Sequence, residues 1–329
     1  MSGGTGLVRR LDALQRRRRC LGLTVAVVRK YLDDDGPRMA ALTTYYGFLS
    51  LFPALLLATA AVTATLQAHP ELQQRLLDHL VRPELQPEVE QALARLPPSG
   101  VPLVVGVLGL LWAGLGGVLA VYFALNRIWC VPWRDRFGVT RQYLRAFAMM
   151  LLTFVCALLA AASALVTDTY LRLPTVERGV SAVVTVAALF AVLTCAHKVL
   201  VCRPLRVADI WVGGAVGAVV VTALLRTATS VLPALVARAG PVYGSFATVV
   251  GLFTLLYLIS QTLVLSVELS SVLEGRLSPR SLTGSVPNAA DRRALALLGR
   301  QQERVAGQVV TTTFAGPEEA PRQHRHPFS

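Results

Sequence analysis

The chain alternates between long apolar stretches and shorter polar segments rich in arginine. Six stretches carry no formal charge: Met39–Ala68, Ser99–Asn126, Ala146–Thr167, Gly179–His197, Ile210–Leu225 with an apolar continuation, and Val242–Val267. Each meets or nearly meets the roughly 20 helical residues that cross a hydrocarbon core about 30 Å thick. No strand-like alternation competes with this pattern. It predicts an all-α, polytopic membrane protein with six transmembrane helices in one bundle.

Lys and Arg are distributed unequally between the polar segments. Of the 32 Lys and Arg residues, 25 lie before the first span, in the second and fourth loops, or after the last span; six lie in the other three loops, and Arg226 lies within a span. Because basic segments stay on the cytoplasmic side, both termini are predicted to be cytoplasmic. The net charge of +13 mostly reflects this topology. Nucleic acid is not an expected partner, since aromatic residues are not interleaved with the basic runs.

The chain divides into a basic N-terminal segment (residues 1–38), a transmembrane domain (39–275) and a polar tail (276–329) that is expected to be disordered. The N-terminal segment places Arg16, Arg17, Arg18 and Arg19 before a nine-residue apolar run, which is too short to span a membrane. This run is either an interfacial helix whose arginines contact anionic lipid headgroups, or part of a solvated arm that only enforces topology. Membrane lipids are the expected partners, and a homo-oligomer is compatible with the pattern.

The sequence offers little chemistry for cofactors or catalysis. None of the five cysteines lies in an outward loop or in a CxxC pair, and no Cys and His residues have zinc-ligand spacing. We therefore expect no disulfide, no metal and no cofactor. No nucleophile–base pair stands out and no nucleotide-binding loop is present, so the chain is not expected to be an enzyme.

Polar residues inside the first span are the first candidates for a substrate path. Thr43, Tyr46 and Ser50 recur at helical spacing, and Pro53 follows them. Pro53 leaves the carbonyl of Leu49 without its helical donor, so a kink is expected there, with the Ser50 hydroxyl able to satisfy the freed group. The polar stripe either lines a path or only forms hydrogen bonds between helices.

The last span and its flanks add Tyr243, Tyr257, Gln261 and Glu268 to these candidates. Glu268 is placed at the cytoplasmic end, where we expect an arginine of the inner loops to pair with it. Arg226 completes the candidate path. If its helix begins near Val207 it lies close to the outer interface, and if the helix continues to Leu235 it lies within the hydrocarbon and should face a cavity or an acidic partner.

Small residues predict where helices approach closely. Gly213 and Gly217 form one small-xxx-small pair, and Ala113 and Gly117 form another. In lipid, such pairs allow tight helix packing, although a backbone that bends during transport would use them too.

Three segments resemble the YihY/BrkB family of bacterial inner-membrane proteins. They run from Ala40 through Thr-Thr-Tyr-Tyr-Gly-Phe to Pro53, from Val242-Tyr-Gly-Ser-Phe246 to Val267-Glu-Leu-Ser-Ser-Val-Leu273, and over Ala124-Leu-Asn-Arg127. The resemblance covers about Lys30 to Arg276 and implies six transmembrane helices with cytoplasmic ends, in a bacterial cytoplasmic (inner) membrane. Ser266-Val267 and Ser270 stand where the family usually has Gly-Ala and Asn.

The resemblance implies little about activity, since family members have been described as virulence or serum-resistance factors and as transporters. An older ribonuclease label is not favoured, because the spans lack the clustered carboxylates or histidines that hold catalytic metals. Two hypotheses follow. The protein is either a transporter or flippase-like protein for an amphipathic or anionic envelope component, or a non-transporting scaffold that recruits partners through its cytoplasmic termini. The absence of membrane-embedded acids argues against a proton-driven transporter.

Overall fold

A computed structural model describes residues 19–68, 100–170, 174–244, 246–281 and 287–314, and these are helical with short connections. The six long helices are α3 (Gly36–Ala68), α6 (Gly100–Ile128), α7 (Val139–Tyr170), α8 (Pro174–Leu200), α9 (Val207–Tyr243) and α10 (Phe246–Glu274). Two shorter α-helices, α2 (Arg19–Asp33) and α11 (Ala289–Gln301), and the 3-10 turn η2 (Trp133–Asp135) complete the described elements.

Five of the long helices are long and apolar enough to cross a membrane: α3, α6, α8, α9 and α10. In hydrocarbon a helix satisfies its own backbone hydrogen bonds, which is why apolar stretches of this length become helices. The all-helical membrane architecture is therefore confirmed. The predicted span Ala146–Thr167 lies within α7, but α7 is not among the five, so the number six stays a prediction.

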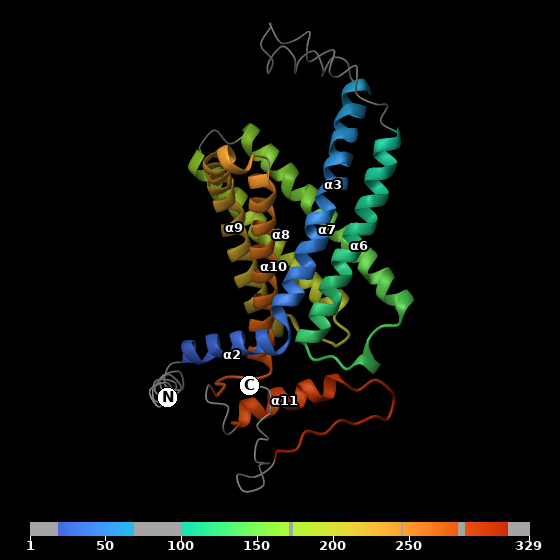
Figure 1. The fold of residues 1–329 in the computed structure, drawn as a ribbon, viewed down its shortest axis with the longest axis vertical. Helices are drawn as coiled ribbons and strands as arrows, with labels where there is room; N and C mark the ends of the chain where they lie inside the picture. Colours follow the sequence, from blue (N-terminus) through green and yellow to red (C-terminus); the bar gives the residue numbers. More distant parts are fainter. Residues whose placement is uncertain (1–18, 69–99, 171–173, 245, 282–286, 315–329) are drawn as a thin grey trace.

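The long helices lie alongside one another, and α2 crosses one end of them (Figure 1). Helix α10 packs against α9, α3 and α2, while α3 packs against α6 and α7 packs against α8. Helix α11 lies beyond α2 at the same end. As a result, α10 connects the α3–α6 pair to α9 and also contacts the crossing helix.

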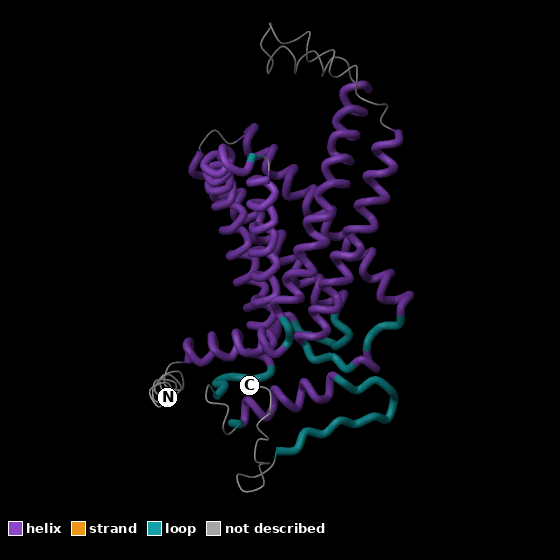
Figure 2. Tube along the Cα trace, in the orientation of Figure 1, coloured by secondary structure: helices purple, strands orange, loops and turns teal. Residues whose placement is uncertain are grey.

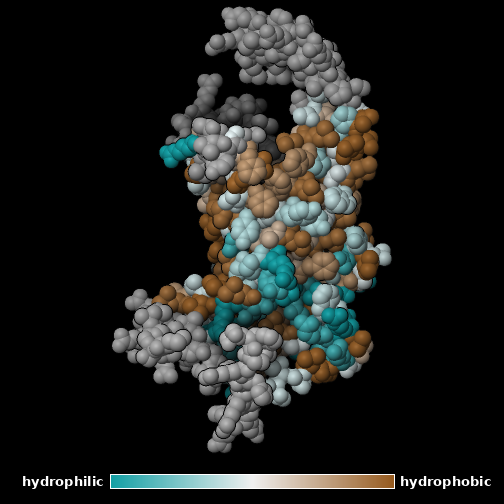
Figure 3. Space-filling view, viewed as in Figure 1, coloured by the Kyte–Doolittle hydropathy of each residue, from teal (hydrophilic) through white to brown (hydrophobic). Residues whose placement is uncertain are grey.

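The basic segments collect at the end of the bundle where α2 lies. The connections from α6 to α7 and from α8 to α9, and the residues after α10, all lie there (Figure 2). Hydrophilic surface also gathers toward this end, while much of the visible side of the long helices is hydrophobic (Figure 3). Apolar side chains such as Phe52, Leu108 and Val183 remain exposed along the helices, as expected of a surface that lipid covers.

The main apolar core lies near this end as well. Tyr122, Ile128 and Trp129 from the end of α6 pack with Leu200 from the end of α8 and Ile210 from the start of α9. Asn126 strengthens this junction. Its amide donates to the Leu200 carbonyl at 2.9 Å and accepts from the backbone N–H of Cys202 at 2.9 Å. One buried amide thus joins the ends of two helices. The sequence pattern around Ala124–Arg127 does not reveal this role of Asn126.

Helix packing follows the small residues. A Cβ on Gly213 would collide with the carbonyl oxygen of Ser266, and one on Gly217 would lie 2.7 Å from the Ser266 hydroxyl. Gly213 and Gly217 therefore bring α9 against α10 at contact distance, as predicted for a small-xxx-small pair. Ser270 donates to the carbonyl of Ile210 at 3.2 Å across this contact. Ser266 and Ser270 are thus small enough for this close approach.

Two expectations about helix ends need correction. The last span was predicted to stop at Val267, but α10 continues to Glu274 and contains Glu268. The segment after α10 was expected to be a polar tail, yet its described part contains α11, which begins with a capping box between Asn288 and Asp291. Reciprocal side-chain bonds of this kind satisfy the free N–H groups of a helix start. The remaining residues of that segment, 282–286 and 315–329, lie outside the described residues.

Adding a methyl group at Gly213 should separate α9 from α10. Gly213→Ala is expected to lower the free energy of unfolding by about 1–3 kcal/mol, since the methyl group has no space beside Ser266. Gly47→Ala is the matched control, because nothing lies within 4 Å of a Cβ there. Thermal unfolding in detergent, followed by tryptophan fluorescence, compares the two. Equal melting midpoints would contradict the close α9–α10 contact.

Candidate functional site

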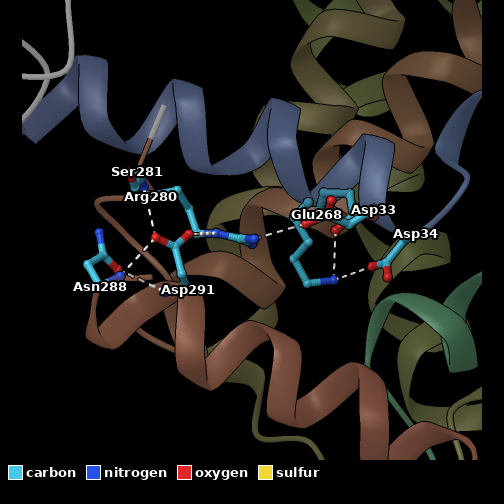
Figure 4. A network of polar contacts seen from close by, with 8 residues as sticks. Asp33, Asp34, Glu268, Arg280, Ser281, Asn288 and Asp291 are labelled. Carbon is cyan, nitrogen blue, oxygen red and sulfur yellow. Dashed lines mark hydrogen bonds and ion pairs between the residues drawn. The ribbon is translucent and has the colours of Figure 1, made fainter. Parts of the chain in front are cut away.

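Charged side chains are buried where α2, α10 and the C-terminal segment meet. Burial of a charge is costly unless partners replace its hydration, so such a concentration is informative. Within the described part of the chain, the buried charged residues are Lys30, Asp34, Glu268, Arg280, Asp291 and Glu303. They form two neighbouring networks, shown in part in Figure 4, and a separate pair around Glu303.

The first network centres on Lys30, and we call Lys30, Asp34 and Glu268 the Lys30 cluster. The Lys30 ammonium donates to Asp34 Oδ2 at 2.5 Å, to Glu268 Oε2 at 2.9 Å and to the carbonyl oxygen of Ile128 at 2.7 Å. An ammonium group has three N–H donors, so all three are used. The cluster thus joins α2, the turn after it, the end of α6 and α10.

Local sequence places each member of the cluster. Lys30 lies in the last turn of α2 on the same face as buried Ala26, and Asp34 follows four residues later. Asp35 then adopts a positive φ of 58°, which turns the chain into α3. Asp35 also accepts from Arg127 at 2.7 Å, and this pair holds the turn against the end of α6.

Electrostatics in the cluster favour a charged Lys30. Burial alone would lower the pKa of Lys30, but Glu268 and Asp34 outweigh it, so its pKa is raised and the ammonium stays protonated. Burial raises the pKa of Asp34, and the attraction of Lys30 offsets only part of that rise. Asp34 therefore gives up its proton less readily than an ordinary aspartic acid.

The second network lies beside the first and is built on Arg280. Its guanidinium donates to Asp291 Oδ1 at 2.6 Å and to Asp33 Oδ2 at 3.0 Å. The other oxygen of Asp291 accepts from the backbone N–H groups of Ser281 and Asn288. Arg280 thereby joins the start of α11 to the end of α2, next to the Lys30 cluster (Figure 4).

The candidates in α10 converge on the Lys30 cluster. Tyr257, Gln261 and Glu268 recur at four and seven residues, which places them on one face of α10. Tyr31 of α2 belongs to the same packed cluster as Tyr257. The prediction that Glu268 pairs with an arginine of the inner loops is wrong, because its partner is Lys30. The reason is that α2 folds back against α10, which helical periodicity does not reveal.

The candidates in α3 are mostly satisfied within their own helix. Thr43 donates to the carbonyl of Met39 at 2.9 Å, and Ser50 donates to that of Gly47 at 2.7 Å. Ser50 therefore does not serve the Leu49 carbonyl, since a hydroxyl in a helix bonds three or four residues back. Tyr46 packs on Gly116, and Pro53 lies beside Gly109, so both face α6.

Arg226 lies far from the Lys30 cluster. Helix α9 begins at Val207, the start that was predicted to place Arg226 near the outer interface. It also continues past Leu235 to Tyr243, the extension that was predicted to place Arg226 within the hydrocarbon. At 1.5 Å per residue, Arg226 is about 28 Å from the start of α9, whereas Glu268 is about 9 Å from the end of α10 at the basic end. The guanidinium is exposed and contacts the Ser181 hydroxyl of α8 at 3.3 Å. The side chain of Tyr243 lies outside the described residues.

Removing the Lys30 ammonium should destabilise the fold. Lys30→Met leaves two buried carboxyl groups without their cation, and we expect the free energy of unfolding to fall by about 3–5 kcal/mol. Arg38→Met is the control. Arg38 is 84% exposed and pairs with Asp35 at 3.8 Å, so its loss should cost less than about 1 kcal/mol. Equal melting midpoints for the two variants would show that the buried network does not hold α2 in place.

Cys130 offers a chemical test of the same environment. Burial, followed by the carboxylates of Asp34 and Glu268, raises the pKa of Cys130 to about 11, although Lys30 opposes the shift. Because only the thiolate reacts, alkylation by iodoacetamide should be slow near neutral pH and rise about tenfold per pH unit toward pH 11. Peptide mapping by mass spectrometry measures this, with exposed Cys20 as the internal reference. Cys130 reacting as fast as Cys20 at neutral pH would contradict the described site.

Within the described residues, no group of three His, Cys, Asp or Glu side chains could hold a metal ion. No curated protein and no solved structure matches the chain. A family model does match: that of the virulence factor BrkB, over residues 27–290. The match includes Lys30, Asp34, Glu268 and Arg280 and covers well over half of the 329 residues. The chain therefore belongs to the BrkB family of membrane proteins.

Proposed function

We propose that this protein is a transporter or flippase-like protein that moves an amphipathic or anionic component of the cell envelope across a bacterial inner membrane. The observation that carries the proposal is Glu268. It is an acidic side chain with 0% exposure inside a helix suited to span a membrane, on the same face as Tyr257 and Gln261. Ionisable groups at such positions are costly, and they generally mark ion or substrate pathways.

An amphipathic substrate is supported by the surroundings of Arg226. An apolar groove of about 510 Å³ lies between α9 and α10, and it is lined by Leu225, Ala228, Thr229, Leu232, Pro233, Thr248 and Leu255. Leu225 precedes Arg226 directly, so the exposed guanidinium lies on the same turn of α9 as the groove, turned toward Ser181 of α8. A guanidinium suits phosphate or carboxylate, and the groove suits an acyl chain. Together they match a lipid with an anionic headgroup.

A second apolar groove, of about 440 Å³, supports the same substrate class. It is lined by residues of α6 and α7 and by Leu57 of α3. Among the described residues that line it, Thr153 is the one with a polar side chain. Thr153 donates to the Met149 carbonyl of its own helix at 2.8 Å, so the groove presents no free donor there. A surface of this kind accommodates hydrocarbon chains and offers nothing to a polar solute.

The topology completes the proposal. The end of the bundle that carries α2 is proposed to face the cytoplasm, because the basic segments gather there. Helix α2 is then an interfacial helix, and its exposed Leu21, Val28 and Leu32 reach toward the bilayer. The side chains of Arg16, Arg17, Arg18 and Arg19, predicted to contact anionic headgroups, lie outside the described residues. Thr43, Tyr46, Ser50 and Pro53 stay path candidates on α3, where Tyr46 and Pro53 pack against α6.

The scaffold hypothesis is less favoured by the described part of the C-terminal segment. This part contacts the protein itself: Gln301 donates to the Arg127 carbonyl at 3.0 Å, and Glu303 pairs with Arg134 at 3.0 Å. Side chains used in this way are not available to recruit a partner. A scaffold role would therefore rest on residues outside this part.

Reconstitution into liposomes tests the proposal. We expect fluorescent phospholipid or polyprenyl-phosphate analogues to cross the bilayer, and Arg226→Ala to slow crossing at least tenfold, since the headgroup loses its cationic contact. Arg238→Ala, an exposed arginine on the same helix, is the matched control and should leave the rate unchanged. Crossing is measured by dithionite quenching of the outer leaflet.

Two results would contradict this proposal. No crossing of any anionic lipid by the wild-type protein would reject the flippase mechanism and direct attention to the scaffold hypothesis. Equal loss in Arg226→Ala and Arg238→Ala would reject the specific role of Arg226.

A further inference from the structure

The Lys30 cluster contains more acid than base. One ammonium faces two carboxyl groups, and Asp34 and Glu268 both have 0% exposure. The neighbouring cations have carboxylates of their own: Arg127 pairs with Asp35, and Arg280 pairs with Asp33 and Asp291. With both of its acids ionised, the cluster would hold a net negative charge in a medium of low dielectric constant, which is strongly unfavourable.

Two oxygen atoms of the cluster lack a donor. Asp34 Oδ1 and Glu268 Oε1 are buried and accept no hydrogen bond from any described group. All three N–H donors of Lys30 are already directed at Asp34 Oδ2, Glu268 Oε2 and the Ile128 carbonyl. Two carboxylates cannot bond to each other, but a carboxylic acid donates to a carboxylate. One proton on either carboxyl group would therefore remove the charge imbalance. Its O–H would also donate to the free oxygen of the other carboxyl group.

We infer that the Lys30 cluster is a proton-binding site in which Asp34 and Glu268 share one exchangeable proton. With the proton bound, one ammonium, one carboxylate and one carboxylic acid form a neutral set. The shifted pKa of Asp34, raised mainly by burial, agrees with this arrangement. Among the described residues, Tyr31 of α2 and Cys130 after α6 also face the cluster. Burial raises the pKa of both, so neither carries charge near pH 7.

A small cavity lies beside the proposed proton-binding site. A cavity of about 10 Å³ adjoins Lys30, Asp34 and Cys130, and the α11 side chains Ala294, Leu297 and Leu298 line its other side. This volume is about that of one water molecule between polar groups. A water there would contact Asp34 and lead toward the polar end of the bundle. Helix α11, held by the Arg280–Asp291 pair, closes the cavity on its outer side.

The site deepens the proposed function by naming an energy source, and to that extent it rests on that function. Loss of the shared proton leaves a negative charge where α2 meets α10, so protonation and the stability of this contact are thermodynamically linked. A proton gradient would then act on the contact between α2 and α10. Binding of the proton does not depend on lipid transport, so it can be tested separately.

Infrared difference spectroscopy of the purified full-length protein in lipid tests the shared proton. The carbonyl stretch of a protonated carboxylic acid is distinct from the carboxylate bands and shifts on H/D exchange. We expect this band in the wild type at neutral pH and its loss in both Glu268→Gln and Asp34→Asn, because either variant leaves Lys30 with one carboxylate and no need of a proton. Glu274→Gln, on the same helix and paired with Arg203, should keep the band.

The outcomes separate cleanly. Absence of the band in the wild type, or its loss in only one of the two variants, would overturn the inference. If Asp34→Asn does not fold, potentiometric titration of the wild type and Glu268→Gln tests the inference instead. Between mildly acidic and mildly alkaline pH, the wild type should release one more proton than Glu268→Gln does. Neither measurement depends on lipid crossing, so failure of the transport assay leaves this result intact. A pH-gradient dependence of crossing that disappears in Glu268→Gln would link the two.

Discussion

The ammonium group of Lys30 is the point on which the basic end of the molecule depends. A buried cation must find partners for every N–H, and Lys30 finds them on a turn, on the end of one membrane helix and in the interior of another. These three partners come from positions 34, 128 and 268, so satisfying one side chain fixes three distant parts of the chain. The orientation of α2 across the bundle follows from this requirement.

The C-terminal segment is held by the same principle. Arg280 meets Asp33 at the end of α2 and Asp291 at the start of α11, and the capping box at Asn288 orders the beginning of that helix. Apolar contacts join the two helices in the same place, where Ala26 of α2 packs with Ala294 of α11. A layer of two short helices thus covers the buried charges, and it separates them from the surroundings of the bundle.

The membrane-spanning part is stabilised differently. Lipid provides no hydrophobic force between helices, so close contact of small residues takes its place. Gly213 and Gly217 against Ser266, and Gly116 against Tyr46, set the approach of α9 to α10 and of α3 to α6. The polar residues of α3 bond within their own helix, while those of α10 lead to the Lys30 cluster. The bundle therefore differs along its length, with buried charge at one end and, farther along α9, an apolar groove and an exposed arginine on the same turn of that helix.

The sequence by itself determined the helical membrane architecture and the close packing at Gly213 and Gly217, because both depend on local properties: the length of an apolar run and the size of a side chain. It also located Glu268 near the basic end. What only the tertiary structure decided is that Lys30, Asp34 and Glu268 meet, that Asn126 bridges α6 to the segment after α8, and that α11 covers the cluster. These contacts join residues up to 238 positions apart. Helical periodicity describes one element at a time, so it cannot show which faces of different helices come together around a buried charge.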